Sequence, residues 1–118
     1  MLAPVCRPLP PTKTHARRHY HWCRTGGETV GTLAIVQGRR EAETYAVDED
    51  TAEPFPVRTW LLAKAADGEV YGVTIDPAGW RCTCTGFVTA RSHGRPRTCK
   101  HVEAVRDLFE SGDLDGAD

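Results

Sequence analysis

The pattern of apolar and polar residues changes twice along the 118-residue chain. Up to about residue 27 apolar residues are sparse, and regular structure is interrupted by Pro4, Pro8, Pro10 and Pro11. From Thr32 onward, short apolar runs are separated by Gly, Asp and Pro, which is typical of β-strands. After Cys99 the apolar residues recur at helical spacing. We therefore expect an α+β fold, with an antiparallel β-meander followed by a β-hairpin and a C-terminal α-helix.

Individual elements follow from local signals. The apolar runs predict strands over 32–37, 57–65, 69–75 and 80–84, and the Asp67-Gly68 pair favours a hairpin turn. Residues 42–47 fit a second strand or a short helix, because Glu and Ala favour helices. Residues 48–56 are acidic and interrupted by proline, which predicts a loop. The segment from Asp76 to Gly79 has the residue preferences of a type I turn.

The C-terminal helix is indicated by the spacing of Val102, Val105, Leu108 and Phe109. Thr98 is a suitable N-cap, and Gly112 is a suitable stop. The chain then divides into four parts. We expect a basic, proline-containing and flexible N-terminal arm over 1–27, a β-rich segment of no assigned family over 28–68, a hairpin-plus-helix module over 69–112 and an acidic tail over 113–118.

The composition indicates the cellular compartment in which the protein is expected. The chain has a mass of 13.0 kDa, fits one small domain, and contains neither an apolar run long enough for a membrane helix nor a secretory signal. We expect an intracellular, cytoplasmic protein, associated with the nucleoid or nucleus if it binds DNA. In a reducing compartment, its five cysteines are expected to be metal ligands or free thiols rather than disulfides.

Two pairs of soft ligands carry the main chemical signal. Cys82 and Cys84 are expected on one strand face, since side chains alternate across a strand, and Cys99 and His101 flank the predicted helix start. Three cysteines and one histidine form a closed tetrahedral ligand set for zinc, which is typical of structural sites. One zinc ion would tie the hairpin to the helix. The alternatives are ordinary buried cysteines or a redox Cys-x-Cys pair, although the redox pair leaves Cys99 and His101 unexplained.

The same residues resemble a SWIM zinc finger, a family defined by Cys-x-Cys, a variable loop and Cys-x-His. The similarity extends over about residues 69–110. It includes the run 70–73, Trp80, Phe87 and the apolar positions after His101, which are Val102, Ala104 and Val105. The resemblance implies zinc bound by Cys82, Cys84, Cys99 and His101. It also implies a binding role towards DNA or proteins.

The loop between the two ligand pairs is rich in arginine. Arg91, Arg95 and Arg97 lie in it, Arg81 and Lys100 flank it, and Gly94 and Pro96 favour an irregular conformation. Clustered arginines suit phosphate contacts, so these five residues are the candidate nucleic-acid surface. The alternatives are a solvated loop that offsets the charge of an anionic zinc centre, or a protein–protein adaptor in which the zinc is purely structural.

The N-terminal segment carries a second set of candidate ligands. His15, His19, His21 and Cys23 could bind another metal or belong to a solvated tail. Nucleic-acid contacts are a further option there, through Arg17, Arg18, Tyr20 and Trp22.

No enzyme is expected from this sequence. It lacks the motifs of zinc proteases, phosphate-binding loops, nucleophile elbows and zinc deaminases, and a closed zinc site offers no position for a substrate. No small-molecule substrate is evident. The large aromatic residues are expected in the core, with Trp80 shielding the zinc site; they are Trp60, Tyr71, Trp80 and Phe109.

Overall fold

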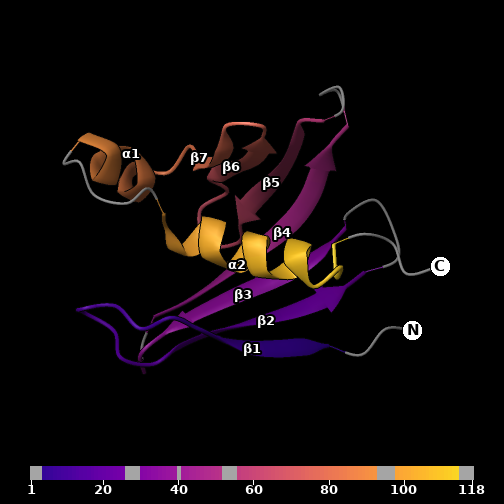
Figure 1. Cartoon of the computed structure of the whole chain (residues 1–118). Helices are drawn as coiled ribbons and strands as arrows, with labels where there is room; N and C mark the ends of the chain where they lie inside the picture. The colour runs from indigo at the N-terminus through magenta and orange to yellow at the C-terminus, as the bar shows by residue number, and fades with distance from the viewer. Residues whose placement is uncertain (1–3, 26–29, 40, 52–55, 93–97, 115–118) are drawn as a thin grey trace. The chain divides into compact units, whose positions relative to one another are not determined.

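The computed structural model describes residues 4–25, 30–39, 41–51, 56–92 and 98–114, with the backbone alone over 89–92. The described chain forms a mostly antiparallel β-sheet followed by helices (Figure 1). The elements in chain order are β1 (Val5–Leu9), β2 (Arg18–Arg24), β3 (Gly31–Gln37), β4 (Glu41–Asp50), β5 (Arg58–Lys64), β6 (Val70–Asp76), β7 (Gly79–Cys82), α1 (Thr85–Ser92) and α2 (Lys100–Glu110).

Strand order in the sheet follows chain order, from β1 at one edge to β7 at the other. The expected combination of an antiparallel sheet with a C-terminal helix is confirmed. Two compact units are distinguished within the chain. Unit 1 comprises Met1–Asp48 and Leu62–Val70, and unit 2 comprises Glu49–Leu61 and Tyr71–Asp118.

Unit 1 contains two strands that the sequence did not predict. The expected flexible arm is instead β1 and β2, which pair antiparallel with Cys6 opposite His21. Pro8 does not prevent regular structure as expected, because it lies in an edge strand, where a missing N–H group is tolerated. In β2, the side chains of Arg18, Tyr20 and Trp22 are buried, and those between them lie on the outward face.

The buried face of β2 removes base stacking from the N-terminal nucleic-acid option. Tyr20 and Trp22 are buried, and Arg18 is 4% exposed, so neither ring can stack on a base. The Arg18 guanidinium donates to the Pro10 carbonyl (2.6 Å) and to Gln37 Oε1 (2.9 Å). Gly31 is needed beside this face, because an added Cβ would lie 2.6 Å from the Trp22 ring.

The ambiguous segment 42–47 is a strand, so the helix alternative is wrong. It forms part of β4, with Tyr45 and Val47 buried and the intervening side chains exposed. The alternation of buried and exposed side chains therefore outweighs the helix propensity of Glu and Ala in this segment. The predicted acidic loop begins later than expected, because β4 continues to Asp50; Glu49 accepts hydrogen bonds from Arg58 at 2.8 and 3.0 Å. Residues 52–55 lie outside the described chain.

Both predicted turns lie where the glycines indicated. The loop between β5 and β6 spans 65–69, so Asp67 and Gly68 lie within a longer loop rather than forming a two-residue turn, and Gly68 has a φ of 75°. In unit 2, the hairpin of β6 and β7 closes with Asp76 paired to Gly79, whose φ is 123°. Asp76 Oδ1 accepts a hydrogen bond from the Ala78 N–H (2.8 Å).

The core of unit 2 contains an aromatic group and the buried face of α2. Trp60 stacks on Trp80 with ring centroids 6.2 Å apart, and Phe109 contacts both rings edge-on at 5.6 Å. The buried residues of α2 are His101, Val102, Ala104, Val105 and Leu108. These contacts confirm the expected core role of Trp60, which is fully buried.

The ends of α2 were predicted with one error. Gly112, with a φ of 82°, ends the helix as expected, and its N–H donates to the Phe109 carbonyl (3.1 Å). The N-cap is Cys99 rather than Thr98. The predicted acidic tail begins with a packed residue, since Leu114 is buried, and 115–118 lie outside the described chain.

Candidate metal centre

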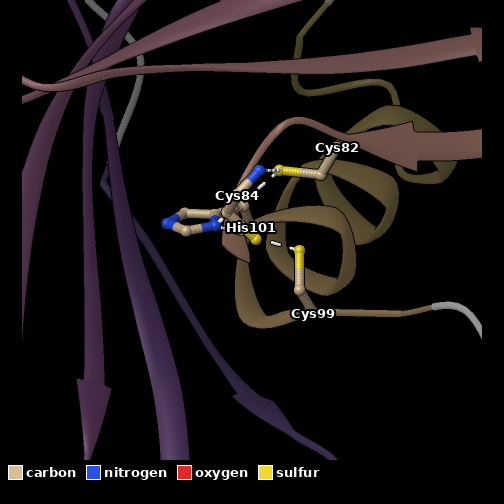
Figure 2. A group of neighbouring side chains, drawn as sticks. All are labelled: Cys82, Cys84, Cys99 and His101. Carbon is tan, nitrogen blue, oxygen red and sulfur yellow. Dashed lines mark hydrogen bonds between the residues drawn. The ribbon is translucent and has the colours of Figure 1, made fainter. Parts of the chain in front are cut away.

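The two ligand pairs come together at the junction of β7 with the two helices. β7 ends at Cys82, and Cys84 follows immediately before α1. Cys99 precedes α2, and His101 lies in its first turn. Cys82, Cys84 and His101 are each at most 7% exposed, and Cys99 is half-buried. Figure 2 shows the four side chains converging from these elements.

The spacing of the ligand atoms fits a single ion. The three sulfurs and one His101 ring nitrogen all lie within 4.8 Å of one another. His101 Nδ1 is 3.9 Å from Cys82 Sγ and 3.8 Å from Cys99 Sγ. Around a tetrahedral zinc with ordinary bond lengths, neighbouring ligand atoms would be roughly 3.5 to 3.8 Å apart. The residues present therefore fit one tetrahedral ion with only a slight contraction.

Each of the three sulfurs also accepts a backbone hydrogen bond. The N–H groups of Cys84, Phe87 and Val102 donate to Cys82, Cys84 and Cys99 respectively, each at 3.4 Å. Three thiolates around a divalent ion would carry a net charge of −1, and such donors lower the cost of burying that charge.

Two of these hydrogen bonds are helix caps. Cys99 caps α2 through the Val102 N–H, and Cys84 immediately precedes α1 and accepts from the Phe87 N–H. In both cases a sulfur takes the place of the side-chain oxygen that usually caps a helix. The N-termini of both helices therefore meet the cluster, and their partial positive charge favours thiolates.

The helix α1 was missed from the sequence, which predicted an irregular loop between the ligand pairs. Residues 85–92 are helical, with Phe87 buried and Val88 exposed. A helix of only eight residues gives almost no periodic signal. The available signal was a cysteine followed three residues later by an apolar residue, a spacing that recurs at Cys99 and Val102.

The three thiols of the cluster shift one another's pKa values. Hydrogen bonds from the Cys82 and Cys99 thiols hold the pKa of Cys84 far below its ordinary value. Hydrogen bonding to Cys84 raises the pKa of Cys82 to about 11, and the bonds of Cys99 to Cys82 and Cys84 raise the pKa of Cys99. A divalent cation is what would allow all three to ionise.

The ring that stacks on the histidine ligand is that of Tyr71. Its centroid lies 4.7 Å from that of His101, with an interplanar angle of 21°. Trp80, which the sequence suggested as the shield, packs with Trp60 and Phe109. The contact of Tyr71 with His101 joins β6 to α2 and could not be read from the sequence, because the two residues are far apart in it.

The candidate nucleic-acid residues are placed only in part. Arg81 is exposed and forms a salt bridge with Asp76, and this contact holds the pKa of that carboxyl below its ordinary value. Lys100 is the first residue of α2 and is half-buried. The Arg91 side chain lies outside the described part of the chain, as do Arg95 and Arg97.

The N-terminal candidate ligands are not gathered as the sequence grouped them. Among the described residues, three or more ligand atoms come together only in the cluster of Cys82, Cys84, Cys99 and His101. His15 lies before β2, with its Nε2 atom 3.5 Å from Glu41 Oε2. His19, His21 and Cys23 lie on the outward face of β2, where the His19 and His21 rings are in contact.

Comparisons with known proteins found no similar protein. No family model matches the chain, no curated protein matches it, and no solved structure matches it. Among the described residues, no helix is both long and apolar enough to cross a membrane.

Proposed function

We propose that this chain is a zinc-binding interaction module of the SWIM type, and that it contacts nucleic acid through the basic loop between its ligand pairs. The observation that carries the proposal is the cluster of three cysteine sulfurs and one histidine nitrogen within 4.8 Å. The order of the ligands, Cys-x-Cys followed by Cys-x-His, is the pattern that defines the SWIM family.

Zinc is the ion that best suits this ligand set. Thiolates and imidazole are soft to borderline donors, which disfavours magnesium and calcium, and a tetrahedral set of three sulfurs and one nitrogen is common for structural zinc. The backbone N–H donors and the two helix N-termini support an anionic centre. Zinc bound here would connect β7, α1 and α2 within unit 2.

A binding role rather than catalysis follows from the closed coordination. Four protein ligands fill a tetrahedral zinc ion, so neither water nor substrate has a position on it. We therefore propose that the ion holds the surface between the ligand pairs in place and takes no part in a reaction.

That surface is the part of the chain proposed to touch phosphate. It begins with α1 and continues through Arg91, Arg95 and Arg97 to Lys100, with no acidic residue from 81 to 101. Arginines close to one another neutralise phosphates and release counterions, which gives affinity that falls steeply with salt. Arg81 contributes less, because Asp76 already holds its guanidinium.

The test is fluorescence anisotropy of the zinc-loaded protein with generic duplex and single-stranded DNA over a range of salt concentrations. We expect affinity to fall steeply with salt, and the triple variant Arg91→Ala/Arg95→Ala/Arg97→Ala to bind weakly with a flatter salt dependence. A charge-matched control is Lys13→Ala/Arg39→Ala/Arg106→Ala, whose residues are all exposed and lie outside the loop. This control should bind almost as the unmodified chain does.

Two outcomes would contradict the nucleic-acid proposal. One is an absence of binding at low salt by zinc-loaded protein, and the other is an equal loss of affinity in both triple variants. Either would favour the second candidate, a protein–protein adaptor with a structural zinc. The exposed positions of α2 carry charges, so within the described chain the exposed Val88 of α1 is the apolar helix residue available to such a partner.

A further inference from the structure

The cluster of unit 2 contains one cysteine that is partly exposed to solvent. Cys82, Cys84 and His101 are at most 7% exposed, whereas Cys99 is half-buried. The three sulfurs lie within 4.8 Å of one another. We propose that a peroxide oxidises the cluster at Cys99, which then forms a disulfide with Cys82 or Cys84 and empties the metal site. This inference rests on the zinc centre of the proposed function.

Solvent access, rather than thiol chemistry, selects Cys99. The thiolate is both the form of cysteine that binds zinc and the form that attacks an oxidant, so each sulfur of a loaded cluster is a nucleophile. Each sulfur also accepts one backbone N–H at the same distance, 3.4 Å. The three residues differ in burial, since Cys82 and Cys84 are buried. A peroxide therefore reaches Cys99 first.

The reaction joins two sulfurs and reduces one peroxide. The Cys99 thiolate attacks a peroxide oxygen, the O–O bond breaks, and a sulfenic acid and a hydroxide are formed. The thiolate of Cys82 or Cys84 then attacks the Cys99 sulfur, so that the S–S bond forms, the S–O bond breaks and a second hydroxide leaves. The two thiolates lose two electrons, and hydrogen peroxide gains them.

The spacing of the sulfurs favours the disulfide over further oxidation. A sulfenic acid next to a thiol condenses with it, whereas an isolated one can proceed to irreversible sulfinic acid. Both candidate partners lie within 4.8 Å of the Cys99 sulfur, and a disulfide bond is about 2.05 Å long. Side-chain rotation with a small shift of the backbone would close that gap.

The disulfide would remove the metal and loosen the start of α2. Disulfide sulfurs carry no thiolate charge, which leaves one thiolate and His101 as ligands for the ion. The Cys99 sulfur is also the N-cap of α2 through the Val102 N–H, and its movement toward Cys82 or Cys84 weakens that hydrogen bond. Oxidation should therefore release zinc and lower the affinity for nucleic acid, and reduction should restore both.

Two further cysteines provide the control. Cys6 and Cys23 are free and exposed in unit 1, and neither belongs to the cluster. Replacing both with serine leaves the three sulfurs of the cluster as the thiols of the chain. The test is treatment of zinc-loaded, full-length Cys6→Ser/Cys23→Ser protein with increasing hydrogen peroxide in the presence of a chromophoric zinc indicator. Tryptic peptides are then mapped by mass spectrometry after the remaining thiols are blocked.

Trypsin separates Cys99 from the other two ligand cysteines. Cleavage after Arg81, Arg91, Arg97 and Lys100 gives one peptide over 82–91 and another over 98–100. We expect each equivalent of zinc released to be matched by one disulfide between these two peptides. The unmodified chain should release zinc at the same rate, and reductant with added zinc should reload the site.

Three outcomes would overturn the inference. The first is zinc release with a disulfide inside the peptide 82–91, the second is zinc that stays bound at peroxide concentrations that fully oxidise Cys6 and Cys23 in the unmodified chain, and the third is markedly slower release in the double serine variant. Release through the expected disulfide in a chain that binds no DNA would support this inference and overturn the nucleic-acid proposal. A reduced chain that takes up no zinc would overturn both.

Discussion

The two cysteine–histidine groups of this chain use the same ligand types in opposite settings. In unit 2, Cys82, Cys84 and His101 are buried, and each sulfur of the cluster accepts a backbone N–H. In unit 1, the outward faces of β1 and β2 carry Cys6, His19, His21 and Cys23, but no three of their ligand atoms come together. The first group is fixed by helix caps and packing before any ion binds, and the second by strand register alone.

The comparison indicates that burial and backbone hydrogen bonds, rather than the types of ligand residue, distinguish a structural metal site. Burial and N–H donors hold the cluster of unit 2 in a metal-ready arrangement, while burial and hydrogen bonding to neighbouring sulfurs raise the pKa of Cys82 and Cys99, which a divalent cation would offset. An exposed group of side chains has neither this preorganised arrangement nor the cost of burying charge. A structural zinc should therefore contribute to the folding of unit 2.

The largest expected effect comes from removing one cysteine of the cluster in unit 2. Cys84→Ser should lower zinc occupancy. It should also lower the free energy of unfolding by several kcal/mol, since a structural zinc ion can provide ~10 to 16 kcal/mol of binding free energy. Hydrogen exchange should speed up across β6, β7 and α2 together. Cys23→Ser, its matched control on an exposed face, should leave exchange in those elements unchanged. Full zinc occupancy and unaltered exchange in Cys84→Ser would show that the four-ligand assignment is wrong.

A smaller effect is expected from the ring that packs on the histidine ligand. Tyr71→Ala removes the stack on His101 and should destabilise the zinc-loaded protein by about 0.5 to 1.5 kcal/mol in urea unfolding. Tyr71→Phe keeps the ring and should recover most of that loss. If the phenylalanine variant were as unstable as the alanine variant, the hydroxyl rather than the stack would be the stabilising group.

The smallest effect is expected from the nearest arginine. Arg81→Ala should change zinc affinity by no more than about twofold, because its guanidinium is exposed and engaged by Asp76. The same variant should move the pKa of Asp76 back up toward its ordinary value, as followed by NMR titration. A large loss of zinc affinity would mean that side-chain charge, rather than backbone N–H groups, offsets the charge of the thiolates.

The strands that the sequence predicted share one property, a local run of apolar residues bounded by turn residues. Those it missed, β1 and β2, contain prolines, histidines and arginines, and their strand character depends on pairing. The choice for residues 42–47 was open because helix propensity and alternation conflict there. Pairing with β3 resolved it, since Tyr45 and Val47 are buried as partners of Leu33 and Gly31.

The sequence by itself determined the ligand set of the proposed zinc centre and the helix that follows it. Both depend on short-range spacing, since Cys-x-Cys, Cys-x-His and the apolar repeat of α2 can be read locally. The tertiary structure alone decided that Cys84 precedes a helix, that Tyr71 stacks on His101 and that Cys6 lies opposite His21. Tyr71 and Cys6 meet their partners by long-range packing and strand register, which bring distant residues together, and α1 is too short to leave a periodic signal.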